Sequence, residues 1–141
     1  MKETILGIIG AAGAAIAAAF GGWDSALTTL VILMAADYIT GLAVAAFFQA
    51  SPKSENGGLS SDAGWKGLAR KCIVLLFVYI ATRLDIVMGT TYLRDAVCIA
   101  YIINELVSLI ENAGLMGVPV PAQITAAIDV LKNGTDADED K

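Results

Sequence analysis

Histidine is missing from this 141-residue chain, and bases are few, with nine Lys and Arg against fourteen Asp and Glu. Without histidine, the chain has no histidine-based catalytic triad and no histidine-containing metal site. The formal net charge of −5, with no basic cluster, argues against nucleic-acid binding. Neither a nucleophile nor a phosphate-binding loop accompanies the acids, so we expect no enzymatic activity, no cofactor and no metal.

Cysteine is also scarce. Cys72 and Cys98 both lie in apolar stretches, where we expect buried free thiols that pack as small hydrophobes. What the chain has in excess is apolar residues, at 57%, against about 45–50% in a typical soluble domain. The excess gathers in four blocks, at residues 4–20, 25–48, 72–88 and 92–110.

The blocks have nearly the length that a membrane requires. A helix crosses the bilayer core with roughly 20 apolar residues, in a range of about 17–25. Block 25–48 meets this easily, and the next two meet it if their terminal charges reach the membrane surface. Block 4–20 is marginal because Ala and Gly add little hydrophobicity. We therefore predict an all-α integral membrane protein with about four membrane-embedded helices.

The first block has two further interpretations. Lys2, an apolar stretch and Ala17-Ala18-Ala19 could form a cleaved signal peptide, although Glu3 offsets the single basic residue. Alternatively, this is an alanine-rich helix with no special role.

Small residues in this block indicate self-association. They recur every four positions, a spacing that lets two helix backbones approach closely in lipid. The residues concerned are Gly10, Ala14, Ala18 and Gly22. We expect this face to mediate a homo-oligomer.

A long polar stretch at residues 49–71 separates the second and third blocks. Pro52 and Asn56-Gly57-Gly58 make its first part a loop. Basic residues border the stretch, namely Lys53, Lys66, Arg70 and Lys71. The positive-inside rule therefore places residues 49–71 in the cytoplasm, and four spans place both termini there too.

The C-terminal region follows Pro119 and Pro121. Apolar residues at helical spacing predict a short amphipathic helix over residues 122–132, which Asn133-Gly134 ends. We divide the chain into a membrane domain, residues 1–134, and an acidic disordered tail, residues 135–141.

Asp37 lies in the middle of the second block, where a charge costs at least about 2.5–3.5 kcal/mol. It must therefore be neutral, paired or in contact with water. Counting about 1.5 Å per residue along each helix, Arg83 reaches a similar depth and is the partner that we predict for Asp37.

Other polar residues lie within the third and fourth blocks or at their ends. Ser108 and Asn112 continue the face of Glu105 at helical spacing. The full set of candidate intramembrane pairing residues is Asp37, Arg83, Asp85, Arg94, Asp95, Asn104 and Glu105. These groups either line a water-filled lesion and join subunits, or form hydrogen bonds that set helix register within one subunit.

Several short motifs, in this order and spacing, resemble the toxin-secretion/phage-lysis holin family. They are Asp37-Tyr38-Ile39-Thr40-Gly41, Leu59-Ser60-Ser61, Trp65-Lys66-Gly67 with Arg70-Lys71, and Tyr101-Ile102-Ile103-Asn104-Glu105, followed by Ser108, Ile110-Glu111-Asn112, Gly117, Pro119 and Pro121. The resemblance covers about residues 30–133. Block 4–20 matches less well, and the acidic tail differs from the basic tails of many holins.

The resemblance implies a multi-pass protein of the bacterial cytoplasmic membrane that oligomerises and forms lesions. Such lesions release a phage endolysin or assist export of large toxins. The bilayer, further copies of the chain and the endolysin or toxin would then be its partners. Two alternatives remain open. One is a small proton-coupled transporter or ion channel using Asp37 or Glu105, and the other is a non-conducting membrane scaffold.

Overall fold

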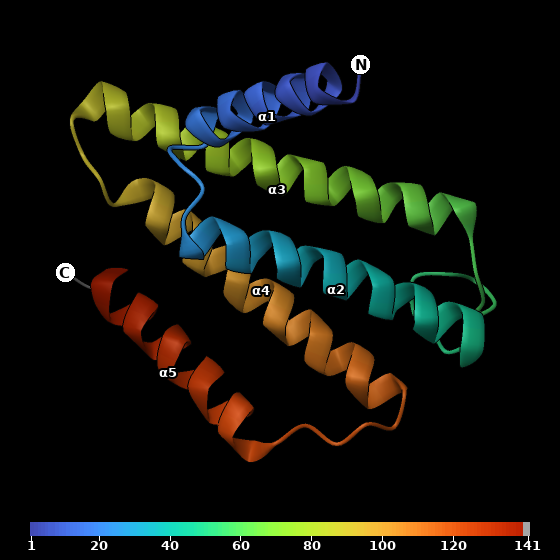
Figure 1. Ribbon diagram of the computed structural model, residues 1–141. Coiled ribbons are helices and arrows are strands. Elements are labelled where there is room, and N and C mark those ends of the chain that lie inside the picture. Colours follow the sequence, from blue (N-terminus) through green and yellow to red (C-terminus); the bar gives the residue numbers. More distant parts are fainter. Residues whose placement is uncertain (140–141) are drawn as a thin grey trace.

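The protein is a bundle of antiparallel helices (Figure 1). The computed structural model describes the backbone of residues 1–139 and the side chains of residues 1–134. Every regular element among these residues is an α-helix: α1 (Lys2–Ala19), α2 (Ser25–Phe47), α3 (Ser61–Met88), α4 (Leu93–Leu115) and α5 (Ala122–Glu139). The all-α prediction is confirmed.

Helix α4 is the centre of the bundle, because it packs against α2, α3 and α5. Its contact with α2 is the most extensive. The buried core consists of Leu27, Leu30, Met34, Val78 and Cys98. These residues come from α2, α3 and α4, so apolar packing joins the three helices toward the end where α2 and α4 begin.

Local signals explain where the helices begin and end. The Asp24 carboxylate accepts a hydrogen bond from the Leu27 amide at 3.0 Å and caps α2. The Ser60 hydroxyl accepts one from the Ala63 amide at 3.3 Å and caps α3. Gly89 ends α3 in the left-handed conformation, with φ of 68°, which costs glycine little.

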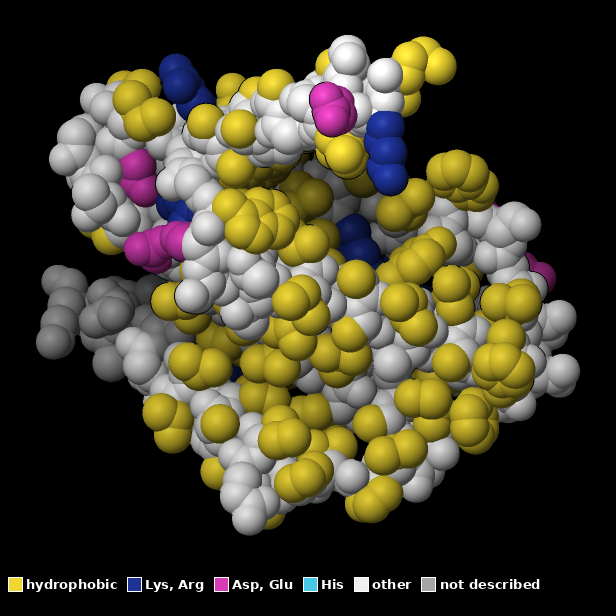
Figure 2. Space-filling model, viewed as in Figure 1, with side chains coloured by type: hydrophobic (Ala, Val, Ile, Leu, Met, Phe, Trp, Pro, Cys, Tyr) yellow, Lys and Arg dark blue, Asp and Glu magenta, His cyan; other side chains and the backbone are white. Residues whose placement is uncertain are grey.

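Two of the described helices, α1 and α2, are long and apolar enough to cross a membrane. Spanning by α3 and α4 stays a prediction. The surface is nevertheless rich in apolar side chains, which dominate the face in Figure 2. Exposed large residues such as Ile39, Ile86 and Val87 belong to this surface. An extended apolar exterior of this kind suits contact with lipid.

Helix α1 differs from the others because none of its residues is buried. Its glycines Gly7, Gly10 and Gly13 have no other part of the chain within 4 Å of where a Cβ would stand. The small-residue face predicted to mediate self-association is therefore open along this helix.

The first part of the stretch 49–71 is a loop, as predicted, and its second half is helical because α3 begins at Ser61. Two predictions of local structure were wrong. Helix α5 continues to Glu139 despite the stop expected at Asn133-Gly134, so residues 135–139 of the acidic tail extend a helix, and residues 140–141 lie outside the described part. Cys72 is exposed, whereas Cys98 is buried as expected.

Candidate functional site

Asp37 sits halfway along α2 and is 6% exposed. One carboxylate oxygen, Oδ1, accepts hydrogen bonds from the Ser108 hydroxyl at 2.6 Å and the Asn112 side-chain amide at 3.1 Å. Asn112 also donates to the Thr40 hydroxyl at 2.9 Å. The polar stripe of α4 thus faces α2 and surrounds this acid with donors, as a buried carboxylate requires.

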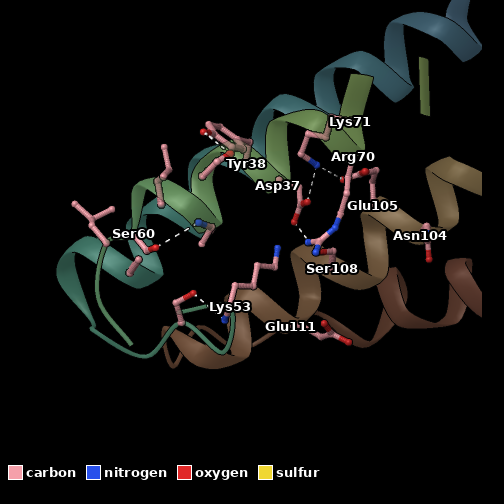
Figure 3. A pocket seen from close by; sticks show the side chains of 18 of the residues that line it. Asp37, Tyr38, Lys53, Ser60, Arg70, Lys71, Asn104, Glu105, Ser108 and Glu111 are labelled. Carbon is pink, nitrogen blue, oxygen red and sulfur yellow. Dashed lines mark hydrogen bonds and ion pairs between the residues drawn. The ribbon is translucent and has the colours of Figure 1, made fainter. Parts of the chain in front are cut away.

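Lys71 of α3 completes the charge network that Figure 3 shows. Its ammonium lies 2.8 Å from Asp37 Oδ2 and 3.0 Å from Glu105 Oε2. The three side chains come from three helices and are mostly buried, with exposures of 15% for Lys71, 7% for Asp37 and 11% for Glu105. A single cation therefore links α2 and α4 through α3.

The network combines two acids with one base. An unpaired charge in a low-dielectric interior is costly, and the cost falls only when partners and hydrogen bonds surround it. Asp37 has Lys71, Ser108 and Asn112 around it, whereas the Glu105 carboxylate has Lys71. The arrangement can hold three helices in register. Movement of these helices away from each other would expose their charged side chains.

The predicted partner of Asp37 was wrong. Lys71 pairs with it, whereas Arg83 is exposed and forms no ion pair with any residue that the structure describes. The depth count placed Lys71 at the membrane surface because it started the third helix at Cys72. With α3 beginning at Ser61, Lys71 and Asp37 each lie about ten residues, or about 15 Å, from the loop that joins α2 and α3.

A second polar cluster lies at the opposite end of the bundle, around Arg94. This arginine is 7% exposed and donates to the carbonyl oxygens of Phe20 and Gly22. It also lies 2.8 Å from the Asp24 carboxylate and 3.3 Å from Asp95. One side chain of α4 therefore holds the connection between α1 and α2.

Asp85 supports this cluster from α3. Its carboxylate accepts hydrogen bonds from the Thr90 hydroxyl and from the amides of Leu93 and Arg94, the two amides at 3.1 and 2.9 Å. Helix α4 has no cap from its own N-cap side chain, so Asp85 satisfies its first amides. This acid fixes the turn between α3 and α4.

The electrostatics at the α1–α2 connection favour an ionised Asp24. Hydrogen bonds from the Arg94 guanidinium and from the Leu27 amide hold the pKa of Asp24 below its ordinary value. The carboxylate is half exposed, at 50%, so solvent screening limits what the ion pair contributes to stability.

The structure divides the predicted pairing residues into three groups. Asp37 and Glu105 meet at Lys71, and Asp85, Arg94 and Asp95 meet near Asp24. Asn104 and Arg83 are exposed and lie outside both clusters. A role of any of these residues in oligomerisation or lesion formation stays a prediction.

Sequence reasoning missed two members of these clusters, Lys71 and Asp24. Both had a usable signal. Ser60-Ser61-Asp62 is a helix-start pattern, and counting from Ser60 brings Lys71 to the depth of Asp37. Asp24 directly precedes an apolar block, as an N-cap residue does.

The comparisons with known proteins agree on one family. A model of the bacteriophage holin family matches residues 14–133. The chain is 38% identical to an uncharacterized protein of Listeria monocytogenes, over 99% of this chain and 95% of the relative. It is 32% identical to a protein of Bacillus phage phi105 named probable holin, over 82% of this chain and 80% of the relative. No solved structure matches the chain.

Proposed function

The chain belongs to the bacteriophage holin family, and we propose that it oligomerises in the bacterial cytoplasmic membrane and forms lesions that release an endolysin. Holins of this family are non-enzymatic membrane proteins.

The observation that supports it most is the bridge from Lys71 to Asp37 and Glu105. Each of three helices contributes one charged side chain, and in one copy these side chains are turned toward each other. Charged groups avoid lipid but tolerate a water-filled cavity. If the helices of each copy move apart on assembly, Lys71, Asp37 and Glu105 would separate and face the water of a lesion.

Helix α1 gives a means of assembly. Association in lipid depends on close packing and polar contacts, since lipid provides little hydrophobic drive between helices. The small residues of α1, Gly10, Ala14 and Ala18, face no other part of the same chain closely enough to be buried. They are free to pack against α1 of a second copy.

Inducible expression in a bacterium tests the proposal. The chain is produced together with an endolysin that lacks an export signal, and culture turbidity and the release of a cytoplasmic enzyme are measured. We expect abrupt lysis that requires both proteins. The lesion would pass a large toxin in the same way, so replacing the endolysin by such a cargo identifies what is exported.

Two outcomes would contradict the proposal. Gradient-dependent flux of a small solute without lysis would indicate a transporter that uses Asp37 or Glu105. Normal growth at high membrane levels of the protein, with the endolysin retained, would indicate a scaffold.

A further inference from the structure

A cavity of about 370 Å³ opens beside the charge network, between α2, α3, α4 and the loop at residues 48–60. Lys53 of the loop and Arg70 of α3 line it, and Figure 3 shows both side chains directed into this space. Neither cation forms an ion pair with a residue that the structure describes, whereas the neighbouring Lys71 has two carboxylate partners. The cavity therefore presents two free cations that converge from different elements.

The charges of the lining restrict the ligand. The cavity also contains three acids, Asp37, Glu105 and Glu111, which balance its three bases. Lys71 forms ion pairs with two of these acids, Asp37 and Glu105. Figure 3 shows the third, Glu111, at the edge of the cavity and directed away from it. A lining that is neutral as a whole suits a ligand with one negative charge better than a multivalent anion.

An apolar groove continues from the cavity. A second hollow shares Tyr38, Leu42 and Leu59 with the first and extends to Trp65 and Leu68. The Tyr38 side chain lies against the small residues Gly64 and Gly67 of α3. A ligand with an anionic head and a hydrocarbon tail would fill both hollows.

The position of the cavity indicates where this ligand comes from. Exposed aromatic residues lie on both sides of the loop in the sequence: Phe47 and Phe48 at its start, and Trp65 in the first turns of α3. Aromatic side chains gather where a membrane protein meets the lipid headgroups. The mouth of the cavity thus lies at the level where phospholipid phosphates are found.

We propose that this cavity binds one anionic glycerophospholipid, such as phosphatidylglycerol. Lys53 and Arg70 contact its singly charged phosphodiester, and an acyl chain lies along the groove past Leu42, Leu59 and Trp65. The lipid would lock the 48–60 loop onto α3. This inference depends on the membrane location of the chain and not on lesion formation.

Native mass spectrometry of the purified full-length protein in detergent tests the proposal. Phosphatidylglycerol and phosphatidylcholine with identical acyl chains are compared on the unaltered chain and on the variants Lys53→Gln and Arg70→Gln. We expect a preference for phosphatidylglycerol that falls about fivefold in each variant, which is the effect of one basic group near an anionic membrane surface. Lys66→Gln is the matched control, because Lys66 lies on the same helix, pairs with Asp62 and does not line the cavity.

Three results would overturn the proposal: equal binding of the two lipids, an equal loss in Lys66→Gln, or displacement of the lipid by millimolar inorganic phosphate. The last would assign the cations to free phosphate. If Arg70→Gln fails to fold, Lys53→Gln decides alone, since Lys53 is an exposed loop residue. The assay measures no lysis, so its failure and that of the proposed function are distinguishable.

Discussion

The Lys71 ammonium lies 2.8 Å from the Asp37 carboxylate, although 34 residues separate the two in the chain. The same ammonium lies 3.0 Å from Glu105. This geometry makes Lys71 the common partner of two acids, which distinguishes it from a member of a simple ion pair.

Replacing Lys71 by Met should be the most damaging change in the network, because it leaves two buried acids without a cation. Loss of one partner from a buried pair costs about 3–5 kcal/mol. Asp37→Asn should cost less, because Lys71 then still pairs with Glu105. Adding Asp37→Asn to Lys71→Met should recover part of the loss.

Denaturant unfolding in detergent micelles, followed by circular dichroism, measures these differences in free energy of unfolding. Lys66→Met is the control on the same helix, where a surface pair with 63% and 76% exposed side chains contributes at most about 1 kcal/mol. Equal effects of the two lysine substitutions would show that the Lys71 bridge does not stabilise the bundle.

Acid should weaken the connection between α1 and α2. The pKa of Asp24 is lowered in the folded protein, so its contribution to stability is complete above the ordinary value of about 3.9 and is lost as the pH falls through the lowered value. Hydrogen exchange at residues 20–24 should be constant, after correction for intrinsic rates, from pH 7 to 5. It should accelerate only below about pH 4.

Arg94→Gln should abolish this dependence and raise exchange at residues 20–24 already at pH 7, because Phe20 and Gly22 also lose a donor. Asp95→Asn is the control, since Asp95 is 58% exposed and 3.3 Å from the guanidinium. The interpretation fails if Arg94→Gln retains the acid dependence of the unaltered chain.

Bulk on the small-residue face of α1 should reduce self-association without disturbing the bundle. Gly10→Leu with Ala14→Leu blocks close approach of two helices, and no other part of the chain lies within 4 Å of a Cβ at Gly10. Cross-linking in membranes should show shorter oligomer ladders. Ala12→Leu adds bulk to the opposite face of α1 and should leave the ladders unchanged, so equal losses in both variants would refute a specific interface.

The loop at residues 48–60 should face the cytoplasm, because Lys53 lies in it and the exposed bases Lys66 and Arg70 follow it. A cysteine at Glu55, in a Cys72→Ser background, should resist a membrane-impermeant reagent added to intact cells. Glu55 is a better position than Ser54, whose hydroxyl is buried. A cysteine at Thr91, in the turn after α3, should react if α3 and α4 span the membrane. Ready labelling of a cysteine at position 55 would show that the loop faces the outside, which contradicts the prediction.

The sequence alone predicted the helices that follow from local pattern. Block 25–48 became α2 at Ser25–Phe47, and block 92–110 became α4 with five more residues at its end. Apolar runs, caps and prolines act within a few residues, so they are legible without a structure. The motifs from Asp37 to Pro121 also indicated the family, which the comparison confirms.

The sequence also showed that Asp37 needed a partner, because an isolated charge in an apolar helix is too costly. It did not show which one. Partner choice depends on where α3 begins and how each helix is rotated, and packing among Leu30, Val78 and Cys98 sets that rotation. Because α3 begins at Ser61, Lys71 lies inside the bundle, whereas Arg83 lies on its exposed surface.

The same reason explains the Arg94 cluster. The charged residues of this cluster were visible near helix ends, but their convergence joins segments 70 to 74 residues apart. Composition and periodicity determined the class of protein and the approximate positions of its helices. The tertiary structure decided which charges meet, because helix register is set by packing between distant segments and not by the residues next to each charge.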